Sequence, residues 1–170
     1  IDSLSFVMED MARNIRLGTV FYCPTKYLLF DPNNIENPQS CPPTDGTYMA
    51  SLILALEGLN GVSDSTFVPS GTSDQIVYDM LPAMKNGIRD DSDGYIRKSR
   101  EGDPTFHGQR ITPDSVHIDL SKSGFTVFGA EAGDNEQPFV VIRLHGMAKY
   151  QNIETPFDIQ TSISPRNIDN

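Results

Sequence analysis

Several features that would indicate a particular chemistry are missing from this chain of 170 residues. It has no tryptophan, two cysteines and three histidines, and its 13 lysines and arginines are outnumbered by 23 aspartates and glutamates, giving a net charge of −10. An acidic surface repels phosphate groups, so we expect neither nucleic acid nor anionic lipid headgroups as partners. No stretch reaches the roughly 18–20 apolar residues that span a bilayer. The apolar fraction of 38% and the charged fraction of 21% are typical of a folded protein.

Signatures of catalysis are missing as well. The sequence contains no GxSxG, HExxH, GxxxxGK or GxGxxG pattern. The histidines are far apart along the chain, at His107, His117 and His145. The last two alternate with apolar residues on predicted strands, which favours positions on a solvent face. We therefore predict no enzyme, no catalytic residue and no cofactor; a hydrolase would need a constellation of residues that this sequence does not contain.

The two cysteines, Cys23 and Cys41, fit no zinc-site spacing, because no CxxC pair is present. In an oxidising compartment they could form a disulfide, which would close most of a long loop and contribute about 3 kcal/mol. In a reducing cytosol they would be two buried thiols. The residues alone favour neither state.

An amphipathic helix is predicted over residues 2–17. Apolar residues recur there at steps of three and four, which is the spacing of one helix face, and Gly18 is a typical stop signal. Glu9 and Arg13 stand four apart in the favourable order and lie off the apolar face. The predicted packing face consists of Leu4, Val7, Met8, Met11 and Ile15.

Beyond the helix the composition changes twice. Residues 18–48 are expected to form a long loop, rich in proline and asparagine, with one short strand at 27–30. Residues 49–170 read as an antiparallel sheet, with turn signals that include Asn86-Gly87 and Asp93-Gly94. The strands are predicted at 51–58, 75–80, 94–99, 115–120, 124–129, 138–148 and 156–164. We expect one domain over residues 1–170, of the α+β class, with the helix packed on the sheet.

One acidic segment has some of the features of a calcium loop. Asp91, Asp93 and Gly94 fall at the third, fifth and sixth places of such a loop, and Asp90 adds a further carboxylate. However, Arg89 stands where the first oxygen ligand should be, and the distal glutamate is displaced by one residue. A solvated hairpin turn is the preferred interpretation of this segment, and a calcium site at Asp90, Asp91 and Asp93 is the alternative.

Two segments resemble a known family. FVMEDMARNIR, residues 6–16, carries an "ED-M-R-IR" pattern at Glu9, Asp10, Met11, Arg13, Ile15 and Arg16. FDIQTSISPRNID, residues 157–169, carries a "QT-S-R" pattern at Gln160, Thr161, Ser162, Ser164 and Arg166. Together with EQPFVVIRLHGMA, residues 136–148, they resemble segments of type IV pilin-like proteins, in particular minor pilins and pseudopilins of the prepilin-type family.

The resemblance implies a pilin-like fold and a non-enzymatic function. The chain would be a structural subunit of a type IV pilus-like, competence or type II secretion filament, with other pilins or pseudopilins as its partners. In that family an apolar, membrane-spanning helix half runs into an amphipathic half like residues 2–17. That half would anchor the full-length protein in the inner membrane before assembly, and its absence here would explain why the sequence begins inside a helical pattern. Without it the head is expected to be monomeric.

The same resemblance implies a location in the periplasm or at the cell surface, where disulfides persist, and so favours a Cys23–Cys41 bond. An alternative function belongs to another class: an extracytoplasmic module that binds a glycan or a secreted protein. Exposed aromatic residues would support that alternative, and tyrosines are placed in or near predicted loops, although the absence of tryptophan counts against sugar stacking. The tyrosines in question are Tyr22, Tyr27, Tyr48 and Tyr150.

Overall fold

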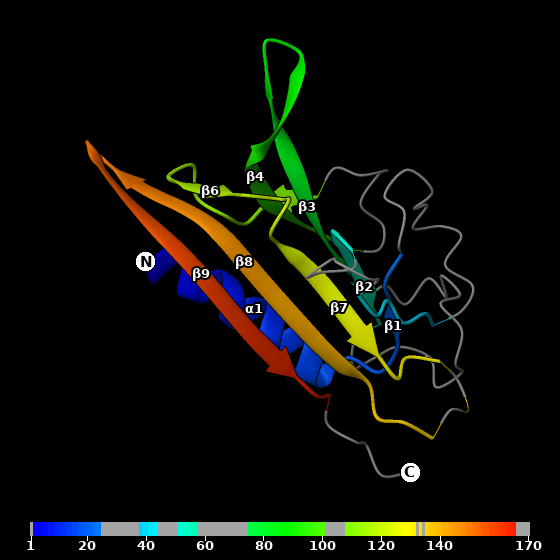
Figure 1. Ribbon diagram of the computed structural model, residues 1–170. Coiled ribbons are helices and arrows are strands. Elements are labelled where there is room, and N and C mark those ends of the chain that lie inside the picture. The colour runs from blue at the N-terminus through cyan, green and yellow to red at the C-terminus, as the bar shows by residue number, and fades with distance from the viewer. Residues whose placement is uncertain are drawn as a thin grey trace.

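The computed structural model describes residues 2–24, 38–43, 51–57, 75–100, 108–131, 133 and 135–165 (Figure 1). Within these residues one helix is followed by nine strands. The elements are α1 (Asp2–Leu17), β1 (Phe21–Tyr22), β2 (Ile53–Leu56), β3 (Ile76–Lys85), β4 (Ile88–Arg100), β5 (Gln109–Arg110), β6 (Val116–Ile118), β7 (Gly124–Phe128), β8 (Phe139–Tyr150) and β9 (Ile153–Ile163).

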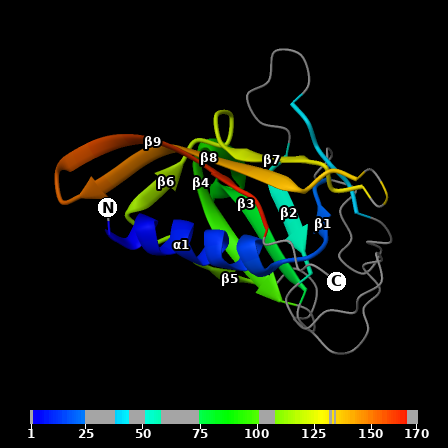
Figure 2. The ribbon, with the colours of Figure 1, turned by 90° about the horizontal axis from the view of Figure 1, so that it is seen from below.

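All nine strands belong to one antiparallel sheet. The strand order is β1-β2-β3-β4-β6-β8-β7, with β5 paired to β4 and β9 paired to β8. The sheet also curls back on itself, because Ser51, just before β2, exchanges backbone hydrogen bonds of 2.7 and 3.0 Å with Phe125 on β7. Strand β9 pairs with β8 along its whole length, so it forms an edge of the sheet, and α1 lies alongside β8 and β9 (Figures 1 and 2).

The predicted fold class is wrong. The structure is mostly antiparallel β-sheet with one short helix, which differs from the pilin α+β fold and its long helix. Two strands are much longer than predicted: β3 has 10 residues and β4 has 13. The sequence also gave no sign of the two-residue strands β1 and β5. Most of the core is consequently supplied by strands, while α1 covers one part of it.

The helix itself has the bounds and the buried face that the periodicity predicts. Leu4, Val7, Met11 and Ile15 are buried in the main core, and Met8 packs against that core while half-buried. Complete burial of such a side chain contributes about 1.5–3 kcal/mol. The apolar face is therefore sufficient to hold a helix of only 16 residues against the sheet.

The β3–β4 hairpin confirms one turn prediction and contradicts another. Its turn is Asn86-Gly87, with φ angles of 52° and 77° that favour this residue pair, so that turn signal is confirmed. The expected turn at Asp90–Gly94 is wrong, because these residues belong to β4. Gly94 serves close packing instead: an added Cβ would lie 2.6 Å from Cδ2 of Leu120 and 2.9 Å from the carbonyl oxygen of Ile118.

Cys23 and Cys41 form a disulfide with a Cα–Cα distance of 5.5 Å, and both are fully buried. Cys23 follows β1 directly, and the backbone N–H of Cys41 donates a 2.9 Å hydrogen bond to the carbonyl of Val127 on β7. The bond therefore ties the segment after the helix to the sheet. The strand predicted at 27–30 lies outside the described residues.

Candidate functional site

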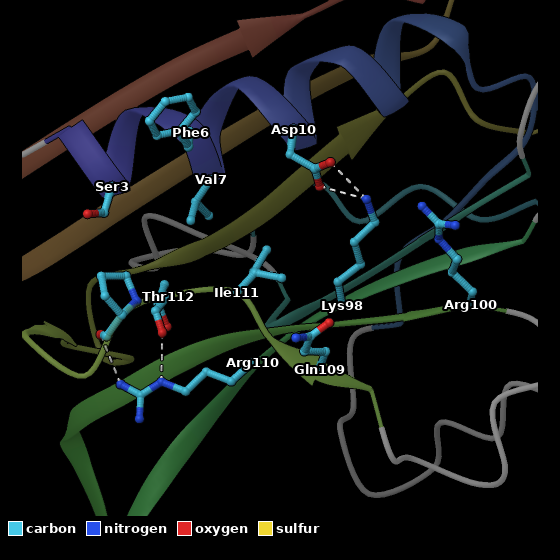
Figure 3. Close-up of a pocket in the computed structure, with 11 residues that line it drawn as sticks. Ser3, Phe6, Val7, Asp10, Lys98, Arg100, Gln109, Arg110, Ile111 and Thr112 are labelled. Carbon is cyan, nitrogen blue, oxygen red and sulfur yellow. Dashed lines mark hydrogen bonds and ion pairs between the residues drawn. The ribbon is translucent and has the colours of Figure 1, made fainter.

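Two grooves flank helix α1. The first lies between α1, the end of β4, β5 and residues 111–113, and has a volume of about 930 Å³; we call it the β4-side groove (Figure 3). The second lies between α1 and β9, has a volume of about 730 Å³, and is called the β9-side groove. Its lining consists of Ser5, Met8, Glu9, Ala12, Arg13, Arg16, Leu17, Ile159, Gln160 and Thr161.

The β9-side groove unites the two ends of the sequence that resemble pilin-like proteins. Glu9, Arg13 and Arg16 are separated by four and three residues, so the helix places them on one face. Gln160 and Thr161, on the edge strand β9, line the opposite wall. Residues about 150 positions apart in the chain thus form a single surface.

The helix charges in this groove have no structural partner in the described part of the chain. Glu9, Arg13 and Arg16 are exposed, and no ion pair or side-chain hydrogen bond joins them to another described residue. The second acid of the helix pattern behaves differently, since Asp10 faces the other groove and is bonded there. The β9-side groove therefore presents charges that are available to another molecule.

A hydrogen-bonded cluster fixes α1 to the sheet in the β4-side groove. Nζ of Lys98 lies 2.8 Å from both carboxylate oxygens of Asp10, and the two side chains point toward each other in Figure 3. The hydroxyl of Tyr78 donates to Oδ2 of Asp10 at 2.7 Å, and Nδ2 of Asn14 donates to the Tyr78 hydroxyl at 2.6 Å. The cluster connects one turn of α1 with neighbouring strands β3 and β4.

The surroundings of this cluster shift the pKa values of Asp10 and Tyr78 in opposite directions. Burial by itself raises the pKa of Asp10, but the hydrogen bonds from Lys98 and Tyr78 and the charge of Lys98 hold that pKa below its usual value. Burial, followed by the hydrogen bond to Asp10, raises the pKa of Tyr78. At neutral pH the cluster is accordingly an ionised carboxylate held by an ammonium group and a neutral phenol.

Arg100 and Arg110 supply the other charges that line the β4-side groove, and Arg110 is paired with the exposed Asp114 at 2.9 Å. Nε of Arg110 donates to the carbonyl of Thr112 at 2.9 Å, and one terminal nitrogen donates to the carbonyl of Pro113 at 3.2 Å. The same guanidinium lies 4.9 Å from the centre of the Tyr95 ring. Arg100 comes from the end of β4 and lines the groove as well. The two grooves together are lined by five of the chain's 13 basic residues, three in one and two in the other, and by two carboxylates.

The acidic segment does not converge on a metal position. Asp90 and Asp93 lie 2.7 and 3.0 Å from Nζ of Lys85, while Asp91 pairs with Arg89 at 2.5 Å. No group of three or more histidine, cysteine or acidic side chains is placed to hold a metal ion in the described ranges. The β3–β4 register shifts at this point, and the three carboxylates are paired with Lys85, Arg89 and His117 instead of converging on one position.

The histidines form no catalytic arrangement among the described residues. Nδ1 of His117 contacts the carboxylate of Asp93, and Nδ1 of His145 lies 3.5 Å from Oδ2 of Asp158. Both rings are half-buried, on β6 and β8, so the predicted solvent-face positions are only partly correct. His107 lies outside the described residues.

Comparisons with known proteins identify no relative: no protein-family model, no curated protein and no solved structure matches the chain. Within the described residues, α1 is neither long nor apolar enough to cross a membrane.

The basic wall of the β4-side groove was not anticipated from the sequence. The one available signal was alternation at the end of β4, where Lys98 and Arg100 are two residues apart and so share a face of the strand. The contribution of Arg110 could not be anticipated, because β5 has only two residues and reaches the groove through its pairing with Arg97 and Lys98.

Proposed function

We propose that this chain is a non-enzymatic assembly subunit, a pilin-like or pseudopilin-like protein of a type IV pilus-like or type II secretion filament. The observation that carries the proposal is the β9-side groove, where the polar residues of the two resembling segments lie together. The proposal does not depend on the pilin fold class, which the structure contradicts. It rests on the local sequence pattern and on the surface that this pattern forms.

The groove suits contact with a neighbouring subunit. Arg13, Arg16 and Glu9 are exposed charges without partners in the described part of the chain, and apolar side chains such as Leu17 line the same groove. Such a mixture of apolar and charged groups is typical of protein–protein interfaces, where arginine is enriched. The acidic chain as a whole would then be recognised through a groove in which two arginines outnumber one glutamate.

The disulfide supports a location outside the cytoplasm, because buried disulfides persist in oxidising compartments. In the proposed mechanism an apolar helix continuous with α1 holds the full-length protein in the inner membrane. The subunit then joins the filament, and its head contacts other pilins through α1 and the sheet.

The test is assembly in the organism that encodes the protein. Full-length protein carrying Arg13→Glu and Arg16→Glu is expected to disappear from the sheared filament or envelope filament fraction, while its thermal stability stays within about 0.5 kcal/mol of wild type. Immunoblotting of the filament fraction gives the readout. Arg89→Glu is the matched control, since Arg89 is an exposed arginine of β4 and its ion pair with Asp91 is exposed as well.

Two results would refute the proposal: wild-type protein that never fractionates with a filament, or a double variant that assembles as well as the control. A glycan or secreted protein that binds wild type, with loss of binding in variants of Tyr150, would favour the binding-module alternative. Tyr150 is the described tyrosine most open to solvent.

A further inference from the structure

Strand β9 is an edge of the sheet, and the register of β8 shows which of its backbone groups point outward. The N–H of Lys149 and the carbonyl of His145 form hydrogen bonds with backbone groups just before and just after β6. Odd-numbered residues of β8 therefore direct their backbone groups toward β6 and β7, and even-numbered residues direct theirs toward the odd-numbered residues of β9. The even-numbered residues of β9 are left with their N–H and C=O groups at the open edge, where no described strand pairs with them.

The two halves of this open edge differ in composition. The first half directs outward the backbone groups of Glu154, Pro156 and Asp158. A proline is tolerated there because it lacks only an N–H that β8 does not use. Charged residues and proline are the means by which natural edge strands discourage further pairing. Residues 159–163, with the sequence IQTSI, contain neither, so the second half of the edge has no such protection.

The unprotected half of β9 is also one wall of the β9-side groove, which Ile159, Gln160 and Thr161 line. Gln160 and Ser162 are its outward-directed residues, and each offers one backbone donor and one acceptor. A strand added at this edge would bond β9 through its backbone and would cover the adjoining flank of α1 with alternate side chains. The edge and the groove therefore fit the same extended segment.

Helix α1 supplies the charges that this segment would meet. Glu9 and Arg13 are separated by four residues, or about 6 Å of helix, and two residues of a strand span about the same length. Arg16 follows about 4.5 Å further on, so one carboxylate can contact both arginines. Since α1 and β9 run in the same direction, a strand antiparallel to β9 passes the arginines before it reaches Glu9 (Figures 1 and 2).

We propose that an extended segment of a neighbouring protein chain adds to β9 as a further antiparallel strand over residues 159–163. The segment places a carboxylate against Arg13 and Arg16 and, two residues later, a basic side chain against Glu9, so its pattern is acid-x-base. The β9 strand of a second copy does not fit, because it contains no basic residue. This inference rests on the proposed function, since it describes how a neighbouring subunit would occupy the same groove.

Synthetic peptides test the charge pattern. The probe is the acetylated and amidated peptide TVTDTKTV, which carries valine, aspartate, lysine and valine on one face of a strand. Its control is TVTKTDTV, in which only the order of the two charges is exchanged. In fluorescence anisotropy with the 170-residue protein at low salt, the probe should bind at least about tenfold more tightly than the control.

N-methylation of the probe tests the backbone pairing. Alternate amides of a strand face opposite edges, so methyl groups on one alternating set block the edge that meets β9, while those on the other set face solvent. One methylated probe should therefore lose binding, and the other should keep it.

A substitution in β9 provides the matching test on the protein. Ser162→Pro removes an outward N–H but no hydrogen bond to β8, and it should weaken binding of the probe by at least about tenfold. Glu154→Pro is the control, since it makes the same change at an outward-directed position away from the groove, and it should leave binding unchanged. Thermal melts establish that both variants fold; if Ser162→Pro does not, the methylated probes on wild type decide the question.

Equal binding of the two charge orders, or tighter binding of the exchanged one, would overturn the proposal. Binding of both methylated probes would also overturn it, as would undiminished binding to a folded Ser162→Pro variant. If the probe does not bind while Arg13→Glu and Arg16→Glu still abolish filament entry, the inference fails and the proposed function stands. If the probe binds as expected but the full-length protein enters no filament, the proposed function fails.

Discussion

The contact between Asp10 and Lys98 should determine how firmly helix α1 is held. Lys98 is only 12% exposed at its side chain, so replacing Asp10 by asparagine leaves a mostly buried ammonium group without its carboxylate. Hydrogen bonds to charged groups contribute about 1.5–3 kcal/mol. Because the Asp10 side chain is 41% exposed, solvent screening reduces the expected cost to about 1–2 kcal/mol. For a domain of this size that corresponds to a fall in Tm of about 2–8 °C.

The assay is urea unfolding followed by circular dichroism, with a double-mutant cycle of Asp10→Asn and Lys98→Met. The two substitutions should show a coupling energy of about 1 kcal/mol, because each removes the partner of the other. Glu9→Gln is the control, since Glu9 is the neighbouring exposed acid of the same helix and should change stability by less than about 0.5 kcal/mol. If Asp10→Asn costs no more than Glu9→Gln, the cluster does not hold the helix and the reasoning is wrong.

The same contact predicts a dependence on pH. The pKa of Asp10 in the folded state lies below its ordinary value of 3.8, since the bonds from Lys98 and Tyr78 outweigh the effect of burial. The folded state therefore binds the Asp10 proton less readily than the unfolded state does. The stabilisation is complete above the unfolded pKa and is lost as pH falls through the lower, folded pKa. Unfolding free energies of wild type and Asp10→Asn should accordingly converge in acid below pH 3.8, and divergence there would contradict the assignment.

Three further outcomes are expected. Replacing both cysteines by alanine should lower the free energy of unfolding by about 3 kcal/mol for a loop with a sequence separation of 18, measured by urea unfolding, and an unchanged midpoint would contradict the tethering role. Gly94→Ala should cost about 1–3 kcal/mol because its Cβ would overlap Leu120, and calorimetry that finds it neutral would refute the close packing. Asp79→Ala should cost about 3 kcal/mol, since Asp79 is the buried partner of Arg97; the urea midpoint measures this, and a cost like that of an exposed ion pair would show that Arg97 finds other compensation.

The helix could be predicted from the sequence because its signal is local. Four of the five residues assigned to its packing face are buried, and it ends at Leu17 just before Gly18. Each of those residues is identified by its spacing from the next, which requires no knowledge of the rest of the chain.

The β3–β4 hairpin shows where local signals fail. Asn86-Gly87 and Asp93-Gly94 are equally good turn pairs in sequence, yet only the first is a turn. What distinguishes them is the neighbour of Gly94: Leu120, which is 26 residues further on, packs where a side chain would be. In a sequence, a glycine that is needed for close packing cannot be distinguished from a glycine that is needed for a positive φ angle until the tertiary packing is known.

The two grooves could not be predicted from the sequence, for a related reason. Their walls come from α1, β4, β5 and β9, and the register of the sheet decides which side chains meet. Asp90 and Asp93, which the local pattern suggested as calcium ligands, form ion pairs with Lys85 instead. The charges that stay available, Arg13 and Arg16, were assigned to the helix and to the resemblance, but the surface that they form with β9 was not predicted.

The disulfide has a mechanical consequence for any subunit that is pulled through its first helix. Tension along α1 passes into β1 and then reaches Cys23, the residue directly after that strand. From there the covalent bond carries the load to Cys41 and into β7 through the hydrogen bond to Val127, so the chain between the cysteines is relieved of tension. A subunit held through its first helix would therefore have a covalent path to β7 beside the β1–β2 hydrogen bonds, and reduction would leave those hydrogen bonds as its first connection to the sheet.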